Sequence, residues 1–300
     1  MMGPFHVAAA NQDLPELGEN SRLNIEYEYR LGSSVYKRLL GRGLIETHPL
    51  LDRYINDMGA RLLSGLENRV REYRFFIVRD DSVNAFALPG GYIGINRGLI
   101  TASQTEHQLA SVMAHEIAHV RLRHGLDLLE KSKDVSNTAI LATLAGLLLG
   151  GVDSQLGAAV LYGSVAGTQQ SLVNFTRENE YEADRFGVEL MQTAQFDATG
   201  MAEFFEILSK LSGTSELGNI EYLRTHPVNN NRIAEALSRA RNRGVVATQL
   251  KDFPLFKDFL QYVSRSEKDL QDFARAYLSF AIDSSEYYDL MFGGKLWKSK

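Results

Sequence analysis

The chain of 300 residues contains no cysteine, which excludes disulfide bonds and any metal site built on thiolates. Histidine and carboxylate side chains are then the strong ligands left for a metal such as zinc. A large excess of one charge is also missing, because the formal net charge is −5 and charged residues make up 23% of the chain. This balance gives no reason to expect a nucleic-acid partner.

Long apolar runs are absent as well. The most apolar tract lies within Thr138 to Tyr162, and its core, Ala139 to Val152, falls short of the roughly 20 residues that span a bilayer. Two interpretations stay open: a buried helical hairpin, or a hairpin that contacts a membrane surface or covers an active site. The first basic residue is Arg22, so we expect residues 1–19 to be a flexible leader without an intact secretory signal.

The remaining chain is long enough for one sizeable domain with an appendage. We expect the domain over 20–250 and a helical C-terminal extension over 251–300. Apolar spacing predicts helices at Asn20–Leu40 and Pro49–Leu66 at the start of the domain.

Aromatic and β-branched residues predict a strand at Tyr73–Val78. The following stretch, Asn84–Asn96, is typical of a strand, a Pro-Gly-Gly turn and a second strand. Its glycines lack the spacing of a Rossmann or P-loop phosphate site, so nucleotide binding is not expected. A small sheet among long helical segments predicts a mostly helical α+β fold.

The segment His115-Glu-Ile-Ala-His119 is the most informative part of the sequence. On a helix, positions i and i+4 share a face, so the two histidines can direct their rings at one metal ion while Glu116 projects beside them. Ser103 and Glu106 have the spacing of a capping box before this helix. The pattern predicts a zinc hydrolase, and the alternative is an amphipathic helix with surface or core histidines.

A second helix, predicted over Ser171–Gln192, carries Glu180 and Asp184 one turn apart on one face, whereas Glu182 points elsewhere. Catalytic zinc sites use three protein ligands and leave a position for water, and a carboxylate is a common third ligand. We therefore expect Glu180 to complete the ligand set. Asp184 is placed to accept the N–H of a ligand histidine and fix its orientation.

Most of the other histidines are expected to be surface or capping residues: His6, His48, His107 and His124. A continuous helix would turn His124 about 140° away from His119, so we do not expect it to bind the same metal.

Taken together with Asn84-Ala-Phe-Ala-Leu-Pro-Gly-Gly91 upstream and Thr225-His226-Pro227 and Arg232 downstream, these motifs resemble the HtpX and CAAX-prenyl-protease family of gluzincin metallopeptidases. The resemblance is greatest to periplasmic members that act in outer-membrane β-barrel assembly, over roughly residues 13–260. It implies a minigluzincin-like domain. The chain departs from the family in two respects, because HtpX-type transmembrane helices are absent and a tetratricopeptide array is not evident.

The resemblance implies one zinc ion per chain, bound by His115, His119 and Glu180, with Glu116 as general base. It also implies that His226 and Arg232 lie at the cleft, where either could stabilise the charge that develops on the scissile carbonyl. The alternatives are an ordinary loop histidine and a surface arginine.

Gly91, Tyr92 and Ile93 resemble the family's cleft-edge strand, and an exposed strand edge binds extended peptides through main-chain hydrogen bonds. The predicted function is a periplasmic zinc endopeptidase that cleaves unfolded, misfolded or stalled envelope proteins, with the outer-membrane assembly machinery as a further partner. The alternative is a chaperone-like module that binds unfolded outer-membrane clients with little proteolysis. A purely structural zinc site is disfavoured because it would not require Glu116.

The stretch from Ser212 to Pro227 is loop-like and leads directly to His226. On a mobile lid, the His226 imidazole could occupy the open zinc position and close the site.

Overall fold

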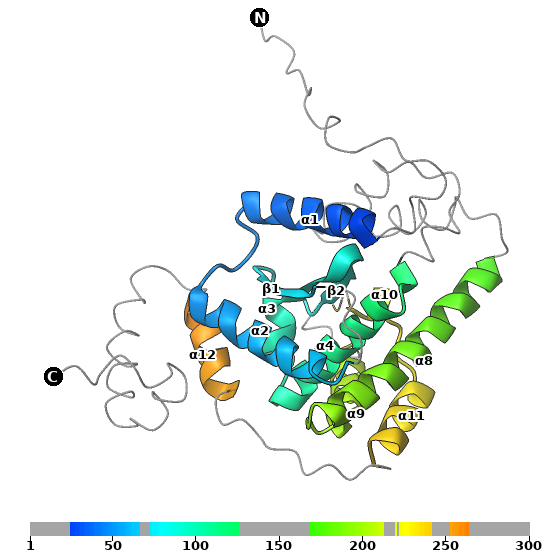
Figure 1. Cartoon of the computed structure of the whole chain (residues 1–300). Coiled ribbons are helices and arrows are strands. Elements are labelled where there is room, and N and C mark those ends of the chain that lie inside the picture. Colours follow the sequence, from blue (N-terminus) through cyan, green and yellow to red (C-terminus); the bar gives the residue numbers. More distant parts are fainter. Residues whose placement is uncertain are drawn as a thin grey trace, which may run out of the picture.

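The structure is a computed structural model that describes residues 25–66, 72–125, 169–212, 220, 222–241 and 253–263 (Figure 1). Within these ranges helices predominate around one small sheet, which confirms the prediction of a mostly helical α+β fold. The predicted leader (1–19), the apolar tract (Thr138 to Tyr162) and most of the predicted extension lie outside the described residues. No helix in the described part of the chain is both long and apolar enough to cross a membrane.

The sheet has the strand order β1-β3-β2. Strand β1 (Arg74–Val78) pairs in parallel with β3 (Tyr92–Asn96), and β2 (Ala85–Leu88) pairs with the other side of β3 in antiparallel register. A single turn of 3-10 helix, Pro89–Gly91, joins β2 to β3, as the Pro-Gly-Gly sequence predicted.

The strand order corrects one prediction. Because β3 is paired on both sides, Gly91, Tyr92 and Ile93 do not form an exposed edge. In the sequence, either strand of the β2–β3 hairpin could have paired with β1. In the structure, β1 pairs with β3. Within the described residues β1 and β2 each have a strand neighbour on one side only. The outer side of β1 is engaged by the bridge between Ile45 and Val78 and by the Asn56 side chain, which bonds to the Phe75 backbone, so β2 carries the free edge.

The two faces of the sheet are covered by different helices (Figure 1). Side chains alternate between faces along a strand, so Phe76 and Val78 pack under α1 (Ile25–Gly41), whereas Phe75 and Ile77 join the main core. That core holds α2 (Pro49–Leu63), α3 (Arg97–Ala102), α4 (Glu106–Arg121), α8 (Gln169–Thr193), α9 (Thr199–Ser212), α10 (Tyr222–Thr225), α11 (Asn230–Arg241) and α12 (Phe253–Val263).

Helix α4 carries the predicted metal-binding histidines and is buried along nearly its whole length. Its capping box is formed by Thr105 and Gln108, not by Ser103 and Glu106 as predicted. The reason is that the Ser103 hydroxyl donates to the Leu99 carbonyl and so completes the end of α3. The cap fixes the residue at which α4 begins, and the regular turn of the helix then determines the direction in which each side chain points.

Helix α8 lies close against α4 because it presents small residues to it. Ala183 is fully buried, and a Cβ added to Gly187 would lie 3.4 Å from the His115 backbone nitrogen of α4. The short interaxial distance brings the side chains of Glu180 and Asp184 to the α4 histidines.

Helix α12 begins the predicted C-terminal extension (251–300), yet it packs into the main core. Phe253, Phe256 and Leu260 are buried there, and the Phe256 ring stacks on Tyr54 with 4.0 Å between ring centroids. The first helix of the extension is therefore part of the same folded unit as the helices of the domain.

Candidate metal centre

Four side chains from three parts of the chain converge at one buried point. Nε2 of His115 lies 2.9 Å from Nε2 of His119, one turn further along α4. Glu180 of α8 directs one carboxylate oxygen at each of these nitrogens: Oε2 lies 3.4 Å from Nε2 of His115, and Oε1 lies 3.4 Å from Nε2 of His119. His226, which follows α10, has its Nδ1 3.3 Å from Nε2 of His115 and 3.0 Å from Oε1 of Glu180.

These separations fit a tetrahedral metal site. A zinc ion with ligand bonds of roughly 2.0 Å holds its ligand atoms about 3.3 Å apart, close to the 2.9 to 3.4 Å found here. One ligand atom from each of His115, His119, Glu180 and His226 lies within 4.8 Å of the other three. The structure thus brings together the three predicted ligands and adds His226 as a possible fourth.

The charges at this point favour a cation. Burial raises the pKa of Glu180, but the neighbouring histidines outweigh burial and hold its pKa well below the ordinary value, so the carboxylate is ionised. Burial lowers the pKa of His119 to about 3, which keeps that ring neutral and able to act as a ligand. An ionised carboxylate and imidazole nitrogens are a donor set suited to Zn²⁺.

His115 is oriented by Asp184, as predicted for that carboxylate. Oδ1 of Asp184 lies 3.0 Å from Nδ1 of His115, which leaves Nε2 facing His119 and Glu180. Burial lowers the pKa of His115, but the carboxylates of Asp184 and Glu180 outweigh burial and raise this pKa to about 10, so without a metal the ring is protonated and would have to release the Nε2 proton to become a ligand. A carboxylate behind a ligand histidine fixes both the tautomer and the ring orientation.

Arg232 of α11 holds the carboxylates in place. Its side chain is 1% exposed, and Nε and Nη2 donate to Asp184 at 2.7 and 2.8 Å. Nη1 lies 2.9 Å from Glu180 and donates to the Pro227 carbonyl at 2.7 Å. The alternative of a surface arginine is wrong. Since these nitrogens face carboxylates and the His-Pro segment, the geometry gives Arg232 a positioning role and not that of an oxyanion donor.

Glu116 lies beside the converging ligands with one oxygen unengaged. Oε1 has no hydrogen-bond partner among the described residues and is 3.6 Å from Nε2 of His226. Burial raises the pKa of Glu116, while His226, His115 and a hydrogen bond from the Ala87 backbone lower it in part. A buried carboxylate with a raised pKa and a free oxygen is suited to general-base chemistry.

The predicted surface or capping role of His124 was wrong, although His124 is not in the group of possible metal ligands. This residue is 5% exposed, its Nδ1 lies 3.0 Å from Nδ1 of His119, and its Nε2 lies 3.3 Å from Glu182. The expected capping role is confirmed for His48, whose Nδ1 accepts from the Leu50 backbone at the start of α2. His107 is buried and accepts from the Asp197 backbone, and His6 lies outside the described residues.

Tyr222 contacts His226 and was not identified from the sequence. Its ring packs against His226 with 4.6 Å between centroids, and its carbonyl accepts from the His226 backbone. Its own N–H donates to the Val83 carbonyl, which ties the segment before His226 to the stretch leading into β2. The helical interval of four residues before His226 is the signal that could have identified it. Much of the predicted lid (213–219 and 221) lies outside the described residues.

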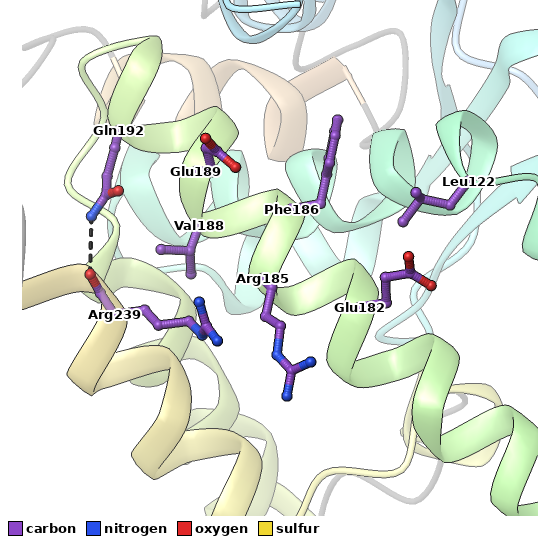
Figure 2. A pocket seen from close by; sticks show the side chains of 8 residues that line it. All are labelled: Leu122, Glu182, Arg185, Phe186, Val188, Glu189, Gln192 and Arg239. Atoms are coloured by element: carbon purple, nitrogen blue, oxygen red, sulfur yellow. Dashed lines mark hydrogen bonds between the residues drawn. The ribbon is translucent and has the colours of Figure 1, made fainter.

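A surface pocket of about 390 Å³ lies on the outer side of α8 (Figure 2). Glu182 and Leu122 form one end of it, while Gln192 and Arg239 meet at the other, where the Gln192 amide donates to the Arg239 carbonyl. Glu182 thus stands between open solvent and the buried His124 ring.

Comparison with known proteins agrees with this geometry. The model of peptidase family M48 matches residues 44–240. The chain is 37% identical over 247 residues to the beta-barrel assembly-enhancing protease of Escherichia coli, covering 81% of this chain and 50% of that protein. It is 36% identical over 233 residues to a putative beta-barrel assembly-enhancing protease of Vibrio cholerae, covering 76% and 48%.

The chain is also similar, at lower identity, to a mitochondrial protein. The mitochondrial metalloendopeptidase OMA1 of Schizosaccharomyces pombe is 29% identical over 216 residues, covering 70% of this chain and 60% of that protein. The chain spans about half the length of the bacterial relatives that it matches.

Proposed function

Because this chain belongs to peptidase family M48, we propose that it is a zinc-dependent endopeptidase that cleaves unfolded, misfolded or stalled proteins of the bacterial envelope. The observation that carries the proposal is the convergence of His115, His119 and Glu180 at tetrahedral distances with the free carboxylate oxygen of Glu116 beside them. A purely structural metal site would have no use for that carboxylate.

The residues of the site would have separate roles in peptide hydrolysis. His115, His119 and Glu180 would hold a zinc ion, which would supply Lewis-acid chemistry toward a water molecule and the scissile carbonyl. Glu116 then takes the proton from water and passes it to the leaving amine. Asp184 and Arg232 keep His115 and Glu180 in the geometry that this chemistry requires.

The free edge of β2 supports an extended peptide as substrate. The Asn96 N–H donates to the Asn84 carbonyl, so in antiparallel register the backbone groups of alternate residues, Ala85 and Ala87, point away from β3. The Ala87 N–H is already engaged by Glu116 and Ala85 is 1% exposed, so the Ala87 carbonyl is the group we propose to pair with a substrate, next to the general base. Backbone pairing selects an extended chain more than a particular sequence, as cleavage of unfolded proteins demands.

The envelope location and a link to outer-membrane assembly rest on similarity to the two beta-barrel assembly-enhancing proteases. Since the chain spans about half of those proteins, both belong to the proposal, as does a location in the periplasm. His226 would add regulation: its Nδ1 lies 3.3 Å from Nε2 of His115 and 3.0 Å from Oε1 of Glu180, so the ring could serve as a fourth ligand and exclude water until it moves aside.

Replacing Glu116 by glutamine tests the proposal. The amide keeps the size of the side chain but cannot act as a base, so zinc content should stay near one per chain while cleavage of casein falls by about 10²-fold or more. Glu189→Gln, at an exposed carboxylate of α8, is the matched control and should cleave normally.

Two results would contradict this assignment. If the Glu116→Gln variant cleaved casein at the wild-type rate, another residue would have to act as the base. A wild-type protein that binds unfolded outer-membrane proteins and loads zinc, yet cleaves none of them, would favour the chaperone-like alternative.

A further inference from the structure

The chain turns sharply after α4. Leu122 still has helical backbone angles, but Arg123 has a φ of 61°, in the left-handed region that residues other than glycine adopt uncommonly. The Arg123 guanidinium is held by Glu28 of α1, with 2.7 Å between Nη2 and Oε1, and Glu28 is fully buried. The reversal redirects His124, which a continuous helix would carry away from His119, back toward it.

The result is a line of contacts that runs from the surface to a metal ligand. The Glu182 carboxylate, whose side chain is 58% exposed, lies 3.3 Å from Nε2 of His124. Nδ1 of His124 lies 3.0 Å from Nδ1 of His119. On the far side of the His119 ring, Nε2 faces His115 and Glu180.

The Glu182 carboxylate at the surface end of this line determines which nitrogen donates in each hydrogen bond. An ionised carboxylate only accepts hydrogen bonds, so Nε2 of His124 carries the hydrogen. In a neutral imidazole the other nitrogen is then an acceptor, and Nδ1 of His124 can receive a hydrogen from Nδ1 of His119. His119 is left with its lone pair on Nε2, the nitrogen that faces the metal position.

We propose that His124 and Glu182 are positioning residues for metal binding: Glu182 fixes the tautomer of His124, and His124 fixes the tautomer and ring orientation of His119. The inference rests on the metal site of the proposed function. The two ligand histidines are thus oriented by different means. His115 has the buried carboxylate of Asp184 behind it, whereas His119 has an imidazole that connects to an exposed carboxylate on the wall of the pocket (Figure 2).

Two substitutions of His124 separate hydrogen bonding from packing. His124→Phe keeps a ring but removes the acceptor, while His124→Asn loses the ring and keeps a carboxamide oxygen near the place of Nδ1. In the zinc-loaded protein of residues 1–300, competition with a chelator should show zinc bound roughly 10 to 100-fold more weakly by the phenylalanine variant. The asparagine variant should stay close to wild type. A packing role predicts the opposite order.

A second pair of variants tests Glu182 from the solvent side. An ammonium group only donates, so Glu182→Lys forces a hydrogen onto Nδ1 of His124, opposite the hydrogen of His119, and should weaken zinc binding by about 10-fold or more. Glu182→Gln can still accept through its amide oxygen and should bind zinc nearly as wild type does. Glu178→Lys makes the same charge change at an exposed site one turn earlier on α8 and should have little effect.

The outcomes are distinct from those of the proposed function. A wild-type protein that fails to bind zinc overturns the metallopeptidase itself. Tight wild-type binding together with equal affinities for His124→Phe and His124→Asn overturns the role of His124. Equal losses in Glu182→Lys and Glu178→Lys reduce the effect to long-range charge and overturn the role of Glu182. Thermal unfolding in a chelator checks that each variant folds, and if His124→Phe does not fold, the Glu182 series decides.

Discussion

Replacing Arg232 by methionine removes the cation that two buried carboxylates share. Arg232 donates two hydrogen bonds to Asp184 and approaches Glu180 at 2.9 Å, with 1% of its side chain exposed. Taking one partner out of a buried ion pair leaves the other charge uncompensated and costs about 3–5 kcal/mol. In the metal-free protein the loss should reach this range because Asp184 and Glu180 both lose the arginine and keep only histidines as partners.

The structure offers a matched control that joins the same two helices. Arg185 of α8 pairs with Glu235 of α11 at 2.6 Å, but its side chain is 51% exposed. Exposed ion pairs contribute about 0–1 kcal/mol, so Arg185→Met should change stability little. The contrast isolates burial, since both pairs link α8 and α11.

Thermal unfolding in the presence of a chelator, followed by circular dichroism, measures both variants. The expected loss for Arg232→Met corresponds to a fall of about 6–20 °C in Tm, at roughly 2–4 °C per kcal/mol for a domain of this size. Added zinc should recover part of the loss because a dication next to Glu180 replaces the missing positive charge. A loss equal to that of Arg185→Met would refute the reasoning.

Two further predictions concern the ligands themselves. His119→Ala should lose zinc, since it removes one of the three ligands, and full occupancy of that variant by elemental analysis would reject the ligand set. His226→Ala should cleave unfolded clients faster if the ring blocks the fourth position, unless the lost contact with the developing oxyanion costs more than the freed site gains. Zinc-edge X-ray absorption should then show one nitrogen neighbour fewer in His226→Ala, and identical spectra would exclude the block.

Much of the site was predictable because it follows from helical periodicity. The spacing of His115 and His119 fixes their common face, and the one-turn interval of Glu180 and Asp184 distinguishes them from Glu182. The structure brings Glu180 to the α4 histidines and Asp184 behind His115, as expected. Packing decides that α8 faces α4. The histidine motif limited the choice, because a carboxylate had to reach the two histidines.

The wrong predictions depend on contacts between residues far apart in the sequence. The position of His124 depends on the left-handed backbone of Arg123, and that turn is held by Glu28 in another helix. Helical rotation cannot predict where a helix stops. Likewise, the hairpin sequence predicts two paired strands but not which of them accepts β1, so the free edge fell on β2 and not on Tyr92 and Ile93.

The part of the chain that family comparison recognises is smaller than the unit that has to fold. The matched residues, 44–240, leave out both α1 and α12. Removing α1 would uncover the face of the sheet that carries Phe76 and Val78 and release Glu28 from the turn that aims His124. Removing α12 would expose the core beside Tyr54. A protein trimmed to the family boundaries would therefore present two apolar surfaces to solvent, and a minimal catalytic fragment should span at least residues 25–263.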